Sequence, residues 1–362
     1  MTETSTSRVA ELTQRRAALR AEAAGNPPAP VEPPQPEAPD VTRSVPRFPI
    51  RVAGLGASVP RQRVSNHDLA ERLDTSDAWI VGRTGIKARH VAGLGETTTS
   101  LAAEAGRRAL ADAGRSPADI DLVIVATATP DSACPSTASR VAAELGLRAS
   151  GFDVNGACSG FVHAFHTASA LLADPSIGTA LVIGADRFTT LIDPEDRGTA
   201  VLFGDGAGAV VLTRAEALPG APGVLGTDLG GDATGLGILE VPLGETYLAM
   251  DGPELFRRAT RGLVASASAA LGRAGATAAD VDLYVPHQAN ARIIGAAADR
   301  LGIPEERVVI DVAERANTSA ASIPLALEAA QRAGRLRPGQ RVLVSGIGGG
   351  LAWSTLFLRW DR

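Results

Sequence analysis

Short apolar runs alternate with longer Ala-rich amphipathic stretches from residue 47 to the end of the chain. Strands and helices are told apart by the length and period of their apolar positions. The runs predict strands at 50–57, 122–127, 151–154 and 180–183, and the stretches between them predict helices at 98–113, 135–145 and 159–173. Strands separated by helices of this length indicate a mixed α/β fold.

The second half of this pattern repeats the first. The segment Ala-Asp-Ile-Asp-Leu at 118–122 recurs as Ala-Asp-Val-Asp-Leu at 279–283, about 161 residues later, and 180–186 is echoed by 342–348. One duplication of this length predicts two homologous halves, and ligand sites often form between such halves. The same offset places 155–159 opposite 317–321, so the polar starts of two matching helices should face each other.

Residues 1–46 differ in composition from the repeated region. Ala, Arg and Glu dominate 8–24, and Pro alternates with Ala and Glu in 26–46, which is typical of an extended linker. We interpret 1–46 as an N-terminal extension, either a tail with a fraying helix or a docking helix on a tether. Residues 47–215 and 216–362 are then the two halves of the fold.

The composition excludes several classes of protein. The 362 residues are 45% hydrophobic and carry a net charge of -5, so there is no global basic footprint for nucleic acid. No apolar run approaches the ~18 residues of a membrane span, and the N-terminus lacks a secretory signal. Two cysteines cannot form a disulfide framework or a structural zinc site. We therefore expect a cytoplasmic protein with free thiols and no metal.

Cys158 is the first candidate for chemistry. It lies in Asp-Val-Asn-Gly-Ala-Cys-Ser-Gly-Phe (153–161), where a predicted strand ends and a helix begins. The N-terminus of a helix lowers the pKa of a thiol and exposes thiolate, so Cys158 is predicted to be a nucleophile. The alternative is a buried structural cysteine.

Two further segments bring groups that complement a thiol. His287 directly follows a strand-like run, and Asn317 opens the helix that the duplication pairs with that of Cys158. A Cys, a His and an Asn converging at strand ends are typical of acyl transfer, in which the thiolate attacks a carbonyl and the others donate hydrogen bonds. The glycine run 346–350 allows close backbone approach and can supply an oxyanion-hole N–H.

The chain from 46 to 360 resembles the β-ketoacyl-acyl-carrier-protein synthase III family of the thiolase-like superfamily. This resemblance implies a five-layered αβαβα fold made of two homologous halves, a homodimer, and a decarboxylating Claisen condensation that starts fatty-acid or polyketide synthesis. The matching motifs, in order, lie at 75–80, 83–86, 156–161, 193–199, 203–208, 286–290, 317–322 and 348–350.

The resemblance also implies roles for the candidate residues. Cys158 accepts an acyl group from acyl-CoA, and the backbone N–H groups of Cys158 and Gly349 hold the oxyanion. His287 and Asn317 hydrogen-bond the thioester carbonyl of malonyl-acyl carrier protein while it loses carbon dioxide. Acyl-CoA is then a substrate, and no resident cofactor is expected.

The same resemblance predicts a coenzyme A site. Trp79 and Arg197 sandwich the adenine, since an aromatic ring and a guanidinium plane both stack well. Arg83 meets the phosphates of coenzyme A. Three further residues are predicted to line the pantetheine tunnel: Gly252, Phe256 and Asn290.

Arg257 and Arg292 match basic positions that meet the acidic carrier protein, although ordinary solvated charges explain them nearly as well. The chain also departs from the family pattern at three positions. Cys134 replaces a Phe that floors the partner subunit's acyl pocket in many members, which predicts a deeper pocket for primers larger than acetyl, unless a neighbouring side chain refills the space. Ala316 stands where Gly usually precedes the Asn, and Asp299 where a basic residue is frequent.

Two motifs have simpler explanations. His163 and His166 are spaced like a metal pair but have no third ligand nearby, so helix packing is the better interpretation. The segment 204–208 lacks the Lys of a phosphate loop and is interpreted as a close-packed turn. Two other functions stay open: acyl transfer from Cys158 without decarboxylation, and a non-catalytic partner subunit of another synthase.

Overall fold

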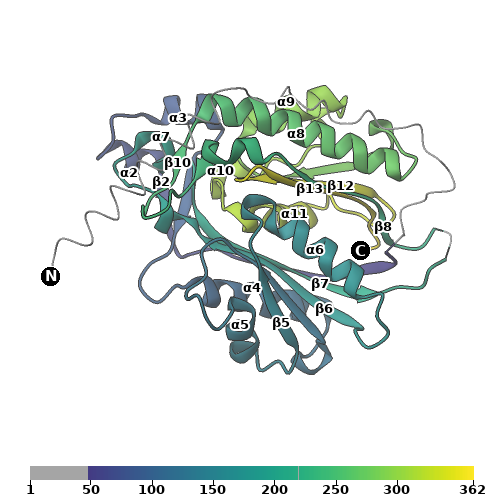
Figure 1. Ribbon diagram of the computed structural model, residues 1–362. Helices are drawn as coiled ribbons and strands as arrows, with labels where there is room; N and C mark the ends of the chain where they lie inside the picture. The colour runs from purple at the N-terminus through teal and green to yellow at the C-terminus, as the bar shows by residue number, and fades with distance from the viewer. Residues whose placement is uncertain (1–47, 219) are drawn as a thin grey trace. The chain divides into compact units, whose positions relative to one another are not determined.

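Two β-sheets carry the longest strands of the computed structural model, which describes residues 48–218 and 220–362 (Figure 1). The first sheet contains, in spatial order, β1 (Ile50–Ser58), β7 (Asp205–Arg214), β6 (Thr179–Arg187), β4 (Leu122–Ala126) and β5 (Ser150–Val154). The second contains β11 (Leu283–Pro286), β12 (Arg341–Gly348), β13 (Ala352–Arg359) and β8 (Gly223–Gly231). β4 runs parallel to β5 and β6, and β11 runs parallel to β12, whereas the remaining pairs are antiparallel.

Three layers of helices enclose the two sheets. The outer face of the first sheet is covered by α4 (Thr98–Ala113) and α5 (Thr137–Leu145). Between the sheets lie α6 (Gly160–Leu171) and α11 (Ser322–Arg332). The outer face of the second sheet is covered by α8 (Gly252–Arg273) and α9 (Ala291–Leu301). The five layers confirm the predicted αβαβα fold.

The Ala- and Gly-rich composition allows the outer helices to lie unusually close to the sheets. A Cβ at Gly54 of β1 would come within 2.3 Å of the Ala109 carbonyl of α4. The second half repeats this contact, because a Cβ at Gly226 of β8 would come within 2.2 Å of the Ala270 carbonyl of α8. Any larger side chain at either glycine would push the helix off the sheet.

The sheets also share their strand order, which confirms the two homologous halves. The series β1-β7-β6-β4 of the first sheet corresponds to β8-β13-β12-β11 of the second. The position of β5 is replaced in the second half by a bridge between Tyr284 and Val308. β5 therefore forms an edge of the first sheet, with Phe152 on it 39% exposed.

Two short 3₁₀ turns meet where the halves join: η3 (Ala157–Ser159) and η8 (Ser319–Ala321). Each turn packs against a glycine of the other half. A Cβ at Gly346 of β12 would lie 2.9 Å from the Ser159 Cα, and one at Gly184 of β6 would lie 2.2 Å from the Ala320 carbonyl. These reciprocal contacts hold the starts of α6 and α11 together, as the duplication predicts.

Smaller elements surround the two sheets and the helices that cover them. They are β2 (Gln62–Ser65), α2 (Asn66–Ala70), α3 (Asp77–Thr84), β3 (Ala88–Val91), η2 (Pro117–Asp119), η4 (Phe188–Leu191), α7 (Arg197–Ala200), η5 (Ala233–Ile238), β9 (Leu239–Glu240), β10 (Ala249–Met250), η6 (Ala278–Asp280), η7 (Glu305–Arg307) and α10 (Val312–Arg315). Most lie at the chain segments that lead into or out of the long strands.

Two sequence expectations need correction. The helix predicted from 135 begins at Thr137, because the Ser136 hydroxyl accepts the Ser139 N–H and caps it. The glycine-rich segment 204–208 is mostly the start of β7 and not a turn. Its close packing was predicted correctly, since a Cβ at Gly208 would lie 2.8 Å from Pro324. The predicted N-terminal extension lies outside the described residues.

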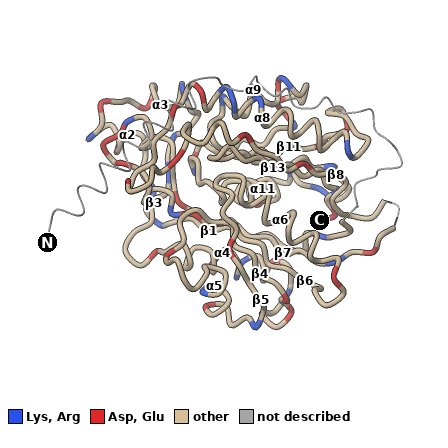
Figure 2. Tube along the Cα trace, viewed as in Figure 1, with Lys and Arg blue, Asp and Glu red and all other residues tan. Residues whose placement is uncertain are grey.

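Charged side chains and buried apolar side chains occupy different layers of the fold. Figure 2 shows charged residues mainly on outer helices and connecting loops, while the strands and the central helices are largely uncharged. The main core fills the space between the sheets and includes Phe161, Phe165, Ile323 and Trp360. Within residues 48–218 and 220–362, no helix combines the length and the apolar character that a bilayer crossing requires.

Candidate active site

Cys158 lies at the centre of η3, between the end of β5 and the start of α6. The preceding Ala157 has a φ of +46°, a conformation that L-residues adopt at a cost of about 1–2 kcal/mol. Gly348, at the end of β12, lies against the turn so closely that a Cβ there would be 2.6 Å from the Cys158 nitrogen. The turn is thus fixed by its own backbone and by the opposite half.

The predicted lowering of the thiol pKa is wrong. Cys158 is only 3% exposed, and burial raises its pKa to about 12, with the nearby negative charge of Asp186 adding to the rise. A helix terminus contributes about 0.3–1 kcal/mol, whereas a charge without water costs several kcal/mol. The resting group is therefore a protonated thiol.

His287 follows β11 and presents one defined nitrogen to the site. Its Nδ1 lies 2.6 Å from the Ser322 Oγ, and that same oxygen accepts the Gln288 N–H at 3.4 Å. We assign the ring proton to Nε2, with the Ser322 hydroxyl donating to Nδ1, since this tautomer gives His287 an N–H donor for the site. Burial lowers the pKa of His287 to about 3, so the ring is a neutral donor.

Asn317 is held by the backbone on both sides. Its N–H donates to the Leu202 carbonyl at 2.9 Å, and its carbonyl accepts the Gly204 N–H at 3.0 Å. The side-chain Oδ1 accepts the Ser319 N–H at 2.9 Å, which leaves the Nδ2 amino group as the free donor. The preceding Ala316 adopts φ +57°, a region that favours glycine, and it does so without releasing Asn317 from these contacts.

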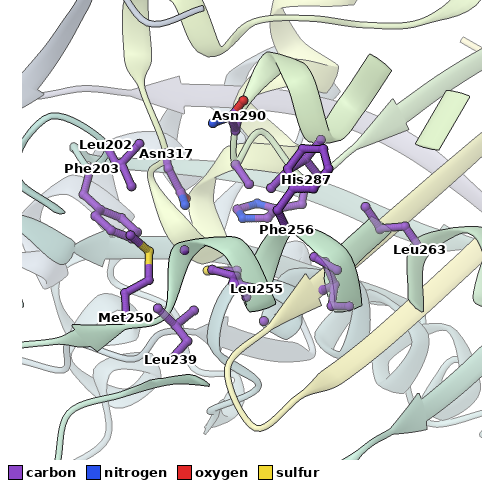
Figure 3. A pocket seen from close by; sticks show the side chains of 17 residues that line it. Leu202, Phe203, Leu239, Met250, Leu255, Phe256, Leu263, His287, Asn290 and Asn317 are labelled. Carbon is purple, nitrogen blue, oxygen red and sulfur yellow. The ribbon is translucent and has the colours of Figure 1, made fainter. Parts of the chain in front are cut away.

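These three side chains line one cavity (Figure 3). His287 and Asn317 extend toward the same space, and the cavity volume is about 130 Å³. Three predicted tunnel residues line it as well: Gly252, Phe256 and Asn290. The other walls are mainly apolar, formed by Leu202, Phe203, Leu239, Met250, Leu255, Ala259, Leu263, Ala289, Ile293, Ile347 and Gly348.

The residues predicted for the adenine lie next to this cavity and not in its wall. The guanidinium carbons of Arg83 and Arg197 lie 4.4 and 5.0 Å from the ring centroid of Trp79. The Asn290 amide connects the two regions, because its Nδ2 donates to the Arg83 carbonyl at 3.1 Å. Arg197 lies directly over the Trp79 ring, so an adenine held between the two requires Arg197 to move away from the ring.

The remaining predicted residues lie further out. Gly349 adjoins the lining Gly348 and packs near the Leu239 carbonyl. Cys134 is exposed and does not line the cavity of its own chain. Arg257 donates to Glu254 at 2.5 and 2.9 Å, and Arg292 lies over the Phe256 ring at 5.8 Å.

Sequence reasoning missed the residues that support the site. Ser322 fixes the tautomer of His287, and it lies inside the matched segment 317–322, which could have drawn attention to it. Asp186, fully buried at the end of β6, accepts the Ala320 N–H of η8. The apolar wall around Met250 and Leu255 comes from segments with no distinctive sequence signal.

The arrangement can stabilise negative charge on an acyl oxygen. Two uncharged N–H donors from the second half, His287 Nε2 and Asn317 Nδ2, share a largely apolar cavity with a thiol from the first half. Fixed donors in such a cavity stabilise developing charge better than water does. In the described part of the chain, no cluster of three or more His, Cys, Asp and Glu side chains could hold a metal.

Two family models match the sequence. Residues 152–233 match the one described as 3-oxoacyl-[acyl-carrier-protein (ACP)] synthase III, and 271–360 match the one for its C-terminal part. The beta-ketoacyl-[acyl-carrier-protein] synthase III of Neisseria gonorrhoeae is 48% identical over 320 residues, which span 86% of this chain and 99% of that protein.

Solved structures give the same likeness. The 3-oxoacyl-[acyl-carrier-protein] synthase III of Aquifex aeolicus VF5 has a TM-score of 0.83 and 41% identity, over 86% of this chain and 100% of that one. The priming beta-ketosynthase of the R1128 polyketide biosynthetic pathway has a TM-score of 0.82 and 40% identity, over 87% and 97% of the two chains. The similarity thus extends across both halves of the fold.

Proposed function

Since the chain belongs to the β-ketoacyl-acyl-carrier-protein synthase III family, we propose that it condenses an acyl group from acyl-CoA with malonyl-acyl carrier protein. The products are a β-ketoacyl-carrier protein, carbon dioxide and free coenzyme A. The observation that carries this proposal is the meeting of Cys158 with two fixed N–H donors, those of His287 and Asn317, in one apolar cavity.

The first half-reaction is acyl transfer to Cys158. The thiol sulfur attacks the thioester carbonyl of acyl-CoA, the bond to the coenzyme A sulfur breaks, and that sulfur leaves with a proton. The tetrahedral oxyanion is held by backbone N–H groups, for which we propose those of Cys158 and Gly349. The close approach of Gly348 to the Cys158 nitrogen supports a backbone oxyanion hole at this point.

The second half-reaction uses the donors of the second half. The malonyl thioester oxygen takes up negative charge as the bond to the carboxylate breaks, and His287 Nε2–H and Asn317 Nδ2–H hydrogen-bond it. The enolate carbon then attacks the acyl-Cys158 carbonyl, the bond to the Cys158 sulfur breaks, and the thiolate that leaves takes up one proton to regenerate the thiol. A neutral His287 suits this step, because it presents an N–H donor without placing a second charge in the apolar cavity.

Coenzyme A binding is proposed along the line from Trp79 to the cavity. The adenine stacks on Trp79 beside Arg197, Arg83 meets the phosphates, and the pantetheine arm passes the apolar wall at Phe256. Both arginines already contact the ring, which supports an aromatic and cationic adenine site. No resident cofactor is part of this chemistry.

We further propose a homodimer in which Cys134 reaches the partner's acyl pocket. The exposed edge strand β5 with its exposed Phe152, together with the exposed Cys134, supports an interface on this side of the first sheet. Cys134 is smaller than the Phe of many members, so the acyl pocket should admit primers larger than acetyl. Arg257 and Arg292, near the tunnel, are proposed to bind the carrier protein. We propose that the reaction takes place in the cytoplasm.

One experiment tests nucleophile and primer together. The purified chain is incubated with acyl-CoA thioesters of increasing acyl length, and mass spectrometry of its peptides locates any acyl group. We expect acyl-Cys158, with acyl groups larger than acetyl accepted. Acylation of Cys158 by acetyl-CoA alone would contradict the deep pocket. Absence of any acyl-Cys158 would contradict the proposed function. Carbon dioxide release on adding malonyl-carrier protein then separates condensation from simple acyl transfer.

A further inference from the structure

Attack by the Cys158 thiol needs an acceptor for its proton, and the cavity side offers none. His287 presents Nε2–H, because its Nδ1 already accepts the Ser322 proton. Asn317 presents its amino group, because Oδ1 already accepts the Ser319 N–H. Protonation of His287 is further opposed by burial, which lowers its pKa to about 3. Neither of these two side chains takes the proton, so among the described residues the carboxylate on the protein side of the thiol is the remaining candidate.

Asp186 is a fully buried carboxylate on that side. Its Oδ1 accepts the N–H groups of Ala128 and Thr129 at 2.8 and 3.1 Å, and two threonine hydroxyls. Its Oδ2 accepts the Ala320 N–H at 3.0 Å. All of these partners are uncharged, and burial raises the pKa of Asp186, so this carboxylate takes a proton more readily than an ordinary aspartate.

Ser319 adjoins both the turn that carries the thiol and the strand that carries this carboxylate. It opens η8, which packs against both η3 and β6, the elements that carry Cys158 and Asp186. The residue is fully buried, and within the described residues its hydroxyl has no hydrogen-bond partner. A buried hydroxyl without a partner costs about 1–3 kcal/mol and calls for an explanation. The Ser319 side chain also lowers the pKa of both Cys158 and Asp186, as a hydroxyl close to both would.

We propose that Ser319 relays the proton of the Cys158 thiol to Asp186 during acyl transfer. As the sulfur bonds to the thioester carbonyl, its proton passes to the Ser319 oxygen, and the Ser319 proton passes to Asp186 Oδ2. When the bond to the coenzyme A sulfur breaks, that sulfur leaves through the tunnel and takes its proton from solvent. The proton held on Asp186 returns through Ser319 when condensation releases the Cys158 sulfur. This proposal rests on the proposed function.

The relay avoids a second buried charge. Releasing the thiol proton to solvent would place a thiolate beside the Asp186 carboxylate, and each buried ion costs several kcal/mol. Transfer to Asp186 exchanges one negative charge for another and leaves their total at one. Among the described residues, the titratable groups that face the thiol are Asp186 behind it and His287 across the cavity, so besides the thiol itself only these two should affect the pH dependence.

The test is the rate of Cys158 acylation as a function of pH in Ser319→Ala. Acyl-CoA is mixed with the full chain, the reaction is quenched at intervals, and acyl-Cys158 is measured by mass spectrometry. We expect a rate independent of pH from about 7 to 9 in the parent chain. The variant should be about 10²-fold slower at pH 7 and gain about tenfold per pH unit, because it depends on the small thiolate fraction.

Two further variants complete the test. Ser319→Gly removes the same hydroxyl and suits the φ of +52° at this position, so it should reproduce the result with the turn relaxed. Ser354→Ala is the matched control, because Ser354 is also fully buried with an unpartnered hydroxyl but lies on β13 and outside the cavity wall. It should acylate like the parent chain.

A purely structural role for Ser319 gives a different result. It would reduce malonyl-carrier-protein decarboxylation together with acylation, whereas loss of the relay leaves decarboxylation unchanged. Parallel losses, or a Ser319→Ala profile identical to that of the parent chain, would overturn the proposal. If the parent chain itself acquired no acyl group, the proposed function would fail with it.

Discussion

The turns η3 and η8 have the same backbone and carry different chemistry. Ala157 and Ser319 occupy matching positions at the start of the two turns and adopt φ of +46° and +52°. The next position is Cys158 in the first half and Ala320 in the second. One half therefore supplies the nucleophile, and the other supplies backbone and side-chain hydrogen bonds to the same site.

The comparison shows how a duplication becomes an asymmetric active site. Reciprocal glycine contacts at Gly184 and Gly346 hold both turns in place, and they do not depend on which side chain each turn carries. The scaffold thus remains symmetric while substitutions at a few positions separate the two half-reactions. Each prediction below breaks or sharpens that separation.

The largest effect is expected from Cys158→Ala. Without the sulfur no acyl-enzyme can form, so condensation should fall by about 10⁶-fold or below detection. Decarboxylation of malonyl-carrier protein should persist, because its donors belong to the other half. The measurement compares product formation with carbon dioxide release, and loss of both together would contradict a division between the halves.

The reciprocal change is Asn317→Ala. Removing one fixed donor should slow decarboxylation by about 10²–10³-fold, while acylation of Cys158 should continue. His287→Ala should behave alike. In the parent chain the decarboxylation rate should not titrate between pH 5 and 8, since the pKa of His287 is about 3 and the ring is neutral above it. A decarboxylation rate that falls as the pH rises through about 6.5, the ordinary pKa of histidine, would show that the ring acts as a cation.

A smaller effect is expected from Ser322→Ala. The variant removes the donor to His287 Nδ1, so the ring is free to place its proton there and present an acceptor at Nε2. Loss of one such hydrogen bond should slow decarboxylation about tenfold. Ser169→Ala is the control, as its hydroxyl is equally buried but bonds the Phe165 carbonyl of α6. Equal losses in both variants would point to stability and not to the tautomer.

The smallest effect concerns the strained backbone of η3. Ala157→Gly should raise the free energy of unfolding by about 0.5–1 kcal/mol, because glycine adopts φ +46° without a Cβ clash. Ala168→Gly, in the right-handed α6, should instead lower it by about 1 kcal/mol. Urea unfolding of both variants measures the difference. Destabilisation by Ala157→Gly would show that the turn is not strained.

The sequence predicted the fold and the central residues because both leave local signals. Apolar runs and the repeated segment at 279–283 defined the sheets and the halves, and the offset brought Asn317 to Cys158 correctly. The family resemblance drew on long motifs of fixed spacing. Helix boundaries such as Thr137 were off by two residues, since a serine cap decides them.

Burial is what the sequence could not provide. From the sequence alone, a cysteine at the start of a helix is expected to have a lowered pKa. In the structure, β12 and η8 from the other half cover Cys158, and this burial raises its pKa. The same applies to Asp186. In the sequence it is an ordinary aspartate at the end of a strand, whereas in the structure it accepts the N–H of Ala320, which lies 134 positions away. Such effects arise from contacts between the halves.

A sulfur that stays protonated and covered is also shielded from damage. Peroxides and alkylating agents react with thiolates that they can reach, so Cys158 should be a slow target for both. Cys134 is exposed to such reagents in the single chain, and the proposed dimer would cover it. An inhibitor selective for the catalytic sulfur should therefore imitate an acyl thioester, because intrinsic electrophilicity alone gives no access to a covered, protonated thiol.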